Sequence, residues 1–236
     1  MGRDSLVISG KDIRKLLTME DDVVTQEKLF SLNAQGKAWC GETAWIQPDS
    51  KVQTYPAEGK MMTGGIEPDW WGVKNIFYGE YDPDGRRRIA ILTIFDAKTL
   101  CPVAVMECLY ILNVRTGAGA AVATKHLARK DARVIGVLGS GATAWFSLLA
   151  HRAIDWPVSK VQIYSRSEER RNTFAEKMSS ETGYNVVPVD SAEKVVREAE
   201  ILITGTATLE PVLEADWVQP GTHVNAMGQK WEIDPQ

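Results

Sequence analysis

The second half of this sequence alternates short apolar segments with amphipathic ones, and this alternation constrains the fold more than any other feature. Five segments have the composition of buried strands, at residues 133–138, 160–164, 185–189, 200–204 and 223–227. Three segments between them are typical of helices, at 142–154, 168–182 and 191–198. Strands and helices that alternate at this spacing are joined by right-handed crossovers and form a parallel sheet. The sequence therefore predicts a doubly wound α/β domain.

A glycine-rich loop stands between the first expected strand and the first expected helix of this domain. It reads Gly-Ser-Gly-Ala-Thr-Ala from Gly139 to Ala144, the GxGxxA form of the dinucleotide fingerprint. Gly139 permits the tight turn, Gly141 lets backbone N–H groups reach a pyrophosphate, and small Ala144 lets the helix approach the sheet. An ordinary glycine turn is the alternative. The residues expected to bind the cofactor here are Gly139, Ser140, Gly141, Ala142 and Thr143.

The end of the second expected strand indicates which nicotinamide dinucleotide is bound. Ser165, Arg166 and Ser167 stand where an NAD-selective site usually has Asp or Glu to hold the ribose 2′-hydroxyl. Two hydroxyls and a guanidinium can instead donate hydrogen bonds to a 2′-phosphate. We therefore expect these three residues to bind the cofactor and to favour NADP(H), with NAD(H) possible. The alternative is that Arg166 stacks on the adenine or lies in solvent, and Glu168 and Glu169 weaken the positive field.

The carboxyl ends of the fourth and fifth expected strands complete the candidate cofactor site. Ligands of open α/β sheets bind just outside the carboxyl ends of the strands. Small side chains there suit a close approach to the ribose and the nicotinamide. The residues expected to make this approach are Thr204, Thr206, Ala207, Asn225, Met227 and Gly228.

The preceding part of the chain has a different texture and is expected to form an α+β domain. A strand at 6–8 and a helix with Ser9 as its N-cap open it. Further strands are expected at 44–46, 72–78, 89–95 and 103–107. An Ala-rich helix over 109–128 follows, whose Gly117 and Gly119 suggest close packing against another element.

Two cations are candidates for contact with a substrate. Arg115 stands in an apolar helical stretch, where it needs an anionic partner, and a substrate carboxylate would satisfy its planar fork. A salt bridge to one of the chain's own carboxylates is the alternative. Lys74 stands among strand-forming residues, and its side chain either faces a cleft or lies on a solvated strand face.

Composition excludes several other classes of protein. The 27 Lys+Arg and 31 Asp+Glu residues give a net charge of −4, which argues against a nucleic-acid binder. Cys40, Cys101 and Cys108 show no CxxC spacing, so we expect no disulfide framework and no metal site, and we expect Cys101 and Cys108 to pack in the core. No apolar run reaches the roughly 18 residues of a membrane span, and no secretory signal is visible. We therefore expect a cytoplasmic protein with no membrane partner.

Motifs spread over most of the chain resemble those of the ornithine cyclodeaminase and mu-crystallin family. They run in order from about residue 60 to residue 235, at 72–74, 95–97, 102–104, 115–118, 128–132, 139–142, 210–213 and 223–228. The resemblance implies a homodimer, with a substrate-binding and dimerisation domain at residues 1–115 and a dinucleotide-binding Rossmann domain at residues 116–236. It also implies catalytic roles for Lys74, beside the reacting centre, and for Arg115, on the substrate α-carboxylate.

The activity implied by this resemblance is hydride transfer at the α-carbon of an α-imino acid or amino acid. The enzyme would be an NAD(P)H-dependent reductase or dehydrogenase of the ketimine reductase or alanine dehydrogenase type. One alternative is an ornithine or lysine cyclodeaminase that recycles NAD and releases ammonia. A second alternative is a non-catalytic, NADPH-dependent binder of a small ligand, like mu-crystallin, with Trp70 and Trp71 lining its pocket.

The sequence departs from the family's pattern in three places. The family's arginine on an early strand has no counterpart in residues 41–46. The cyclodeaminase aspartate that follows the segment ending at Gly228 cannot be assigned either, which counts against the cyclodeaminase alternative. Family members continue through a sixth strand and a returning helix, and we expect that segment to be missing from this sequence.

Overall fold

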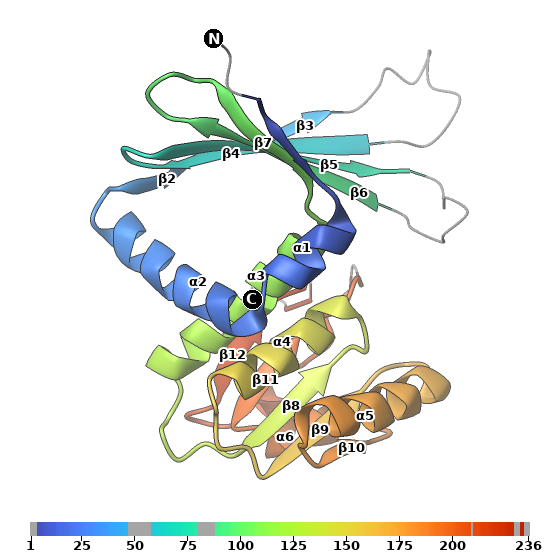
Figure 1. Cartoon of the computed structure of the whole chain (residues 1–236). Coiled ribbons are helices and arrows are strands. Elements are labelled where there is room, and N and C mark those ends of the chain that lie inside the picture. Colours follow the sequence, from blue (N-terminus) through green and yellow to red (C-terminus); the bar gives the residue numbers. More distant parts are fainter. Residues whose placement is uncertain (1–3, 47–57, 80–87, 209, 229–231, 234–236) are drawn as a thin grey trace. The chain divides into compact units, whose positions relative to one another are not determined.

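The structure, a computed structural model, describes residues 4–46, 58–79, 88–208, 210–228 and 232–233 (Figure 1). The chain divides into two compact units, each described here by itself. Unit 1 comprises Met1–Thr18 and Glu27–Leu112, and unit 2 comprises Met19–Gln26 and Asn113–Gln236. The first turns of one helix, α2 (Met19–Ala34), therefore belong to unit 2, although the rest of that helix belongs to unit 1.

Within its described residues, unit 1 is built on a seven-stranded sheet of order β1-β7-β6-β5-β4-β2, with β3 also paired to β4. The strands are β1 (Leu6–Ile8), β2 (Ala38–Cys40), β3 (Ala44–Ile46), β4 (Glu58–Ile66), β5 (Trp70–Tyr78), β6 (Arg88–Asp96) and β7 (Pro102–Glu107). All pairs are antiparallel except β1 with β7. Helix α1 (Gly10–Leu16) begins after Ser9, whose hydroxyl accepts from the Asp12 N–H as expected for an N-cap.

The two faces of the unit 1 sheet differ. On one face, Ile76 and Ala90 are buried together with Cys108. Side chains on the opposite face are largely exposed although they are apolar, and we call this the open face. Its large apolar residues are Trp39, Met61, Trp71, Phe77, Ile89 and Ile91, between 36% and 53% exposed.

Unit 2 holds the predicted doubly wound α/β domain, with a five-stranded parallel sheet of order β10-β9-β8-β11-β12 in its described residues. The strands are β8 (Val134–Leu138), β9 (Lys160–Tyr164), β10 (Val186–Pro188), β11 (Ile201–Thr204) and β12 (His223–Ala226). The helices are α3 (Leu109–Leu127), which begins in unit 1, then α4 (Ala142–Ala153), α5 (Glu168–Thr182), α6 (Ala192–Glu198) and the short η1 (Ala215–Trp217). The predicted fold class is confirmed, and the predicted ends of these strands and helices are within one or two residues of those observed.

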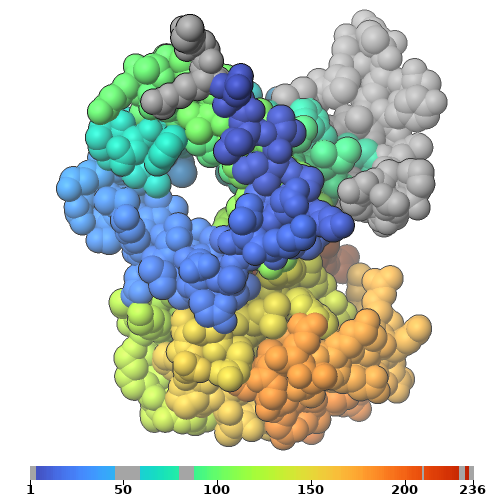
Figure 2. All heavy atoms as spheres, viewed as in Figure 1, coloured from blue at the N-terminus to red at the C-terminus, as the bar shows by residue number. Residues whose placement is uncertain are grey.

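Helices cover both faces of the parallel sheet. On one face, side chains of β8, β9 and β11 pack with Leu148 of α4 and Phe174 of α5. In the space-filling view, the yellow and orange part of the chain, which includes α4 and α5, forms a continuous surface (Figure 2). On the other face, Leu202 packs with Val195 and Val196 of α6. A ligand can therefore reach the sheet mainly at the ends of its strands.

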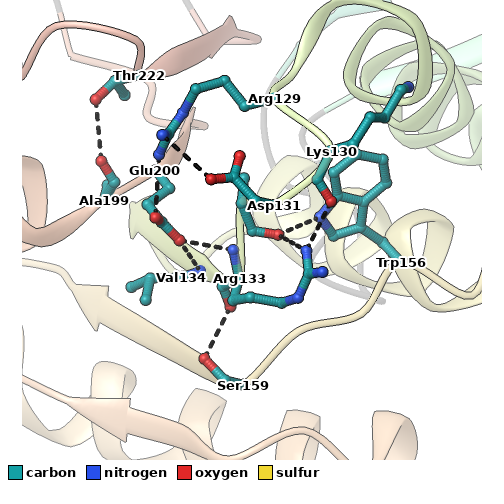
Figure 3. A network of polar contacts seen from close by, with 11 residues as sticks. Arg129, Lys130, Asp131, Arg133, Val134, Trp156, Ser159, Ala199, Glu200 and Thr222 are labelled. Atoms are coloured by element: carbon teal, nitrogen blue, oxygen red, sulfur yellow. Dashed lines mark hydrogen bonds and ion pairs between the residues drawn. The ribbon is translucent and has the colours of Figure 1, made fainter.

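A carboxylate fixes the start of this sheet (Figure 3). Glu200, just before β11, accepts from the backbone N–H groups of Arg133 (2.6 Å) and Val134 (3.0 Å) at the start of β8. Its other oxygen accepts from the Arg129 guanidinium at 3.1 Å. These backbone hydrogen bonds hold the pKa of the Glu200 carboxyl below its usual value, because they favour the charged form.

Sequence patterns missed some elements of unit 1. Helix α2 was not predicted because only Asp22 and Val23 of its 16 residues are buried, so no apolar stripe marks it. Strand β4 was not predicted because it contains Gly59, Gly64 and Gly65, which disfavour strands. Aromatic rings take the space above two of these glycines: a Cβ on Gly65 would lie 2.7 Å from Trp39 Nε1, and one on Gly59 would lie 2.8 Å from Phe77.

The expected burial of both later cysteines is half right. Cys108 is buried, but Cys101 is exposed. Cys101 lies in the turn between β6 and β7, where the Asp96 carboxylate accepts from the N–H groups of Lys98 and Thr99 and holds the chain at the surface.

Candidate functional site

The glycine-rich loop follows β8, the strand at which the order of the parallel sheet switches from one side to the other. Strands β9 and β10 lie on one side of β8, and β11 and β12 lie on the other. Gly139 has a φ of +110°, and a Cβ there would lie 2.6 Å from the carbonyl oxygen of Gly205. Only glycine fits this position, because both the dihedral and the space exclude a side chain.

The first turn of α4 is open toward a ligand. Gly141 is the N-cap of this helix and makes no side-chain capping hydrogen bond. A Cβ on Gly141 would meet its nearest atom only at 3.9 Å, so none of the described residues fills the space beside its backbone. Ala144 is fully buried. Its backbone nitrogen lies close to Gly205, because a Cβ added to Gly205 would be only 3.1 Å from it. An uncapped helix N-terminus beside open space has the donors and the dipole direction to hold a phosphate, so the geometry fits a dinucleotide.

The structure brings the predicted cofactor residues together at the carboxyl ends of the strands of this sheet. Gly139 donates its N–H to the Tyr164 carbonyl (2.8 Å), and Gly205 donates to the Leu138 carbonyl (2.8 Å). Met227 donates to the Thr204 carbonyl at 3.0 Å. The loops after β8, β9, β11 and β12 are therefore neighbours. The fourteen predicted cofactor-binding residues lie in these loops, at the carboxyl ends of β11 and β12, and in the first turn of α4.

The loop after β9 is held by its serines. The Ser140 hydroxyl donates to Ser165 Oγ (3.2 Å), and Ser165 Oγ donates to the carbonyl of Ser167 (3.2 Å). Ser167 Oγ caps α5 by accepting from the Arg170 N–H. Arg166 is exposed. A phosphate at this loop would meet the hydroxyl of Ser167, the guanidinium of Arg166 and the N-terminus of α5.

Asn225 is a predicted cofactor residue whose buried side chain makes its hydrogen bonds within the protein. It is 4% exposed, its amide nitrogen donates to Thr124 Oγ1 (2.9 Å), and its amide oxygen is 3.2 Å from His223 Nε2. A contact between Asn225 and a cofactor therefore has to be made by its backbone. The predicted cofactor role of this residue stays a prediction.

Two buried polar side chains near the same loops have atoms without a hydrogen-bond partner among the described residues. Glu232 was not predicted as a site residue, and Thr204 was predicted without its hydroxyl being recognised as buried. Glu232 is 1% exposed, and its Oε1 accepts from the Thr206 N–H. Its Oε2, like the hydroxyl of fully buried Thr204, has no hydrogen-bond partner within the described residues. No motif marks Glu232, which follows Gly228 by four positions. Thr206 and Gly228 were predicted to bind the cofactor, so Glu232 lies beside that set.

Arg115, the predicted carboxylate anchor, lies on α3 in the part that belongs to unit 2. Its neighbours on the helix, Val114 and Ala118, are buried, but Arg115 itself is exposed. The apolar residues of the helix are therefore buried beside Arg115, while its own side chain is exposed.

The expected alternative for Arg115, one of the chain's own carboxylates, has a structural counterpart in Asp22. Asp22, on the first turns of α2, is 6% exposed, and burial raises the pKa of its carboxyl to about 6. A hydrogen bond from Gln26 and the positive charge of Arg115 oppose this rise. Asp22 was missed by sequence reasoning because α2 was missed. The role of Arg115 in holding a substrate stays a prediction.

Lys74 lies on β5 in unit 1, on the face of the sheet that also carries the buried side chain of Ile76. It is paired with Leu92 on β6 and with Met62 on β4, and it is two positions before buried Ile76 on the same face. Lys74 is itself half-buried. This position counts against the alternative of a lysine on a solvated strand face, and the catalytic role of Lys74 stays a prediction.

The tryptophans proposed for a ligand pocket are exposed. Trp70 is 46% exposed and Trp71 is 38% exposed. Trp71 packs edge-on against Trp39 with ring centroids 5.6 Å apart, and its indole N–H donates to Glu67 at 3.2 Å. Trp71 lies on the open face of unit 1, so among the residues that the structure describes in that unit it lines no enclosed pocket.

The sheet order and the glycine loop define unit 2 as a Rossmann-type domain. The sequence profile of the ornithine cyclodeaminase/mu-crystallin family matches residues 4–232, and the chain belongs to this family. The predicted family is therefore confirmed.

The chain is similar to amino-acid and imino-acid oxidoreductases. It is 30% identical over 236 residues to alanine dehydrogenase of Archaeoglobus fulgidus, covering 98% of this chain and 70% of the relative. The structure of Thermococcus litoralis Δ1-pyrroline-2-carboxylate reductase with NADH and L-proline matches with a TM-score of 0.84 and 30% identity, over 94% of this chain and 68% of that one. An archaeal alanine dehydrogenase dimer with bound NAD matches with a TM-score of 0.83 and 28% identity, over 94% and 67%. These relatives belong to the predicted class, oxidoreductases of amino acids and imines. No helix in the described parts of the chain has the length and apolarity to cross a membrane.

Proposed function

We propose that this chain is an NAD(P)-dependent oxidoreductase that transfers hydride between the nicotinamide and the α-carbon of an α-imino acid or the corresponding amino acid. The observation that carries this proposal is the open, uncapped N-terminus of α4 behind Gly139, at the switch point of a parallel sheet. It occurs in a chain whose relatives are named for the oxidation or reduction of alanine and of pyrroline-2-carboxylate.

A bound nicotinamide dinucleotide supplies or accepts the hydride. The chain's own residues bind and orient. Arg115 holds the substrate carboxylate through the two parallel N–H groups of its guanidinium, which fixes the direction of the α-carbon. In the reductive direction the C=N bond opens as hydride arrives, and its electron pair goes to the nitrogen. Lys74 donates the proton that the nitrogen takes up with this electron pair, and its positive charge favours the transfer.

NADP(H) is the proposed preference at the loop after β9. Its support is the absence of a carboxylate at Ser165, Arg166 and Ser167 and the N-terminus of α5 beside them. NAD(H) is bound by the similar solved structures, so both cofactors belong in the test. We expect Arg166→Ala to weaken NADPH binding roughly tenfold, about 1.4 kcal/mol, and to leave NADH binding nearly unchanged. Arg170→Ala, which removes an exposed charge from the first turn of α5, is the matched control. Equal losses for both cofactors would refute the proposed preference.

A homodimer formed through the open face of unit 1 is also part of the proposal. Its support is the set of exposed aromatic and aliphatic side chains on one sheet face, because such patches on soluble proteins usually mark an interface. Ile91→Glu, on this face, is expected to yield monomers in light scattering. Leu16→Glu, at a 69%-exposed position on α1, is the control that keeps the dimer.

A cytoplasmic location is also part of the proposal. Its support is that Cys40, Cys101 and Cys108 are free thiols.

A cofactor-oxidation assay tests the proposed activity. The purified chain is mixed with NADPH or NADH and either pyruvate plus ammonia or a cyclic α-imino acid, and absorbance at the nicotinamide band is followed. Substrate-dependent oxidation is the expected result. Ammonia release from ornithine or lysine without added cofactor would support the cyclodeaminase alternative. Ligand binding without turnover of any α-imino or α-keto acid would support the non-catalytic alternative.

A further inference from the structure

A chain of buried hydrogen bonds crosses unit 2 and joins three of its elements. Thr124 Oγ1, on α3, lies 2.9 Å from His151 Nε2 on α4, and it accepts from the Asn225 amide on β12, also at 2.9 Å. His151 Nδ1 lies 2.7 Å from the carbonyl oxygen of Ser147. Thr124 and His151 are fully buried. None of these contacts involves a group that the proposed reaction uses directly.

The direction of every hydrogen bond in this chain follows from one carbonyl. The Ser147 oxygen can only accept, so His151 carries its hydrogen on Nδ1. Burial lowers the pKa of His151 to about 4, so the ring is neutral at pH 7 and Nε2 is a bare acceptor. Thr124 must then donate to Nε2 and accept from Asn225. This arrangement orients the Asn225 amide with its oxygen toward His223.

The joined elements are those that carry the proposed site. Helix α3 carries Arg115, about two and a half turns before Thr124. Helix α4 begins at the glycine loop, and the Ser147 hydroxyl donates to the carbonyl of Thr143 in its first turn at 2.8 Å. Strand β12 ends at Ala226, just before Met227, and the inward Asn225 side chain fixes the backbone there.

From this connectivity we infer that Thr124 and His151 are positioning residues, which hold the carboxylate anchor on α3, the phosphate loop of α4 and the end of β12 in register with one another. The inference rests on the proposed dinucleotide-dependent function, because the register matters only if those three elements share a substrate and a cofactor. A satisfied core histidine with no effect on catalysis is the competing explanation.

Thr124→Val tests this inference, since valine keeps the shape of threonine but leaves both His151 Nε2 and the Asn225 amide without a partner. Thr124→Ser keeps the hydroxyl and is the matched control. Both are assayed well below their melting temperatures, with the folded fraction checked by circular dichroism. We expect kcat of Thr124→Val to fall roughly 10- to 100-fold, and kcat of Thr124→Ser to stay near that of the wild type. An unchanged kcat in Thr124→Val, even with a lowered melting temperature, would overturn the inference.

A second measurement on the wild type covers the case in which Thr124→Val does not fold. The chain has three histidines, so ¹⁵N NMR can resolve their ring nitrogens. We expect His151 to be the neutral Nδ1–H tautomer at pH 7, with a hydrogen-bonded Nε2. The opposite tautomer or a charged ring would contradict the inference. A wild type that neither binds nor oxidises NADPH or NADH would instead refute the proposed function, and the NMR result would still decide whether the hydrogen-bond chain exists.

Discussion

Gly117 and Gly119, two positions apart on α3, offer a matched test of how α3 packs on α4. A Cβ on Gly117 would lie 2.9 Å from the backbone nitrogen of Ser147 and closer still to the backbone carbonyl of Phe146. A Cβ on Gly119 would meet no atom of the described part of the chain within 4 Å. The same change, glycine to alanine in one helix, should therefore have opposite effects at the two positions.

The expected magnitudes follow from these contacts. Alanine at Gly117 meets backbone atoms that cannot rotate away, so α4 has to move by about 1 Å to restore normal contact. Overpacking of this kind costs about 1 to 3 kcal/mol, which outweighs the helix propensity that alanine adds, about 1 kcal/mol. We expect Gly117→Ala to lower the free energy of unfolding by about 2 kcal/mol. Gly119→Ala should raise it by about 0.5 to 1 kcal/mol.

Thermal unfolding followed by circular dichroism measures both effects. For a chain of this size, about 1 kcal/mol corresponds to roughly 2 to 4 °C in Tm, so Gly117→Ala should melt at least about 4 °C lower than the wild type. It should also bind NADPH more weakly, because α4 begins at the phosphate loop. A Gly117→Ala protein that melts at or above the wild-type temperature would show that the helices are not in backbone contact at this point.

Three other predictions concern pH and the cofactor loop. Asp22 has a pKa near 6 in the folded chain against 3.8 for the free group, so folding favours its protonated form and this group's contribution to stability falls as pH rises from about 4 to 6. Asp22→Asn should remove that dependence and raise the free energy of unfolding at pH 8 by up to about 3 kcal/mol in urea titrations, whereas an unchanged pH profile would contradict it. Glu200 has a lowered pKa, so its stabilisation is present above pH 4.5 and is lost as pH falls through the lower folded value. Glu200→Gln should cost about 1 to 2 kcal/mol at pH 7 and almost nothing at the acid end, and equal losses at both pH values would contradict this. Gly139→Ala, forced into a φ of +110° against Gly205, should raise the NADPH Kd at least about tenfold in fluorescence titrations, and wild-type affinity would count against the loop as the phosphate site.

Unit 2 could be predicted from the sequence because its signals are local. Each of its strands is a short apolar run, and Gly139 and Gly141 mark the turn that the sheet order requires. Gly117 was expected to permit close packing, and the contact with the backbone of α4 confirms it. Gly119 was expected to do the same, and it does not.

The parts that could not be predicted depend on contacts between distant residues. Asp22 reaches the surroundings of Arg115 only because α2 packs Val23 against Ala118 and Ala121 of α3. The inward side chain of Asn225 depends on Thr124, 101 positions earlier. A sequence motif places a residue on a loop but does not show whether its side chain or its backbone faces the ligand.

The central claim, hydride transfer to an α-carbon, is tested most directly by following the label itself. The chain is incubated with cofactor deuterated at the transferable position of the nicotinamide and with a cyclic α-imino acid, and the amino-acid product is analysed by mass spectrometry and NMR. The account predicts one deuterium per product molecule, located on the α-carbon. Product with no deuterium at that carbon, or no product from any α-imino acid despite cofactor binding, would contradict it.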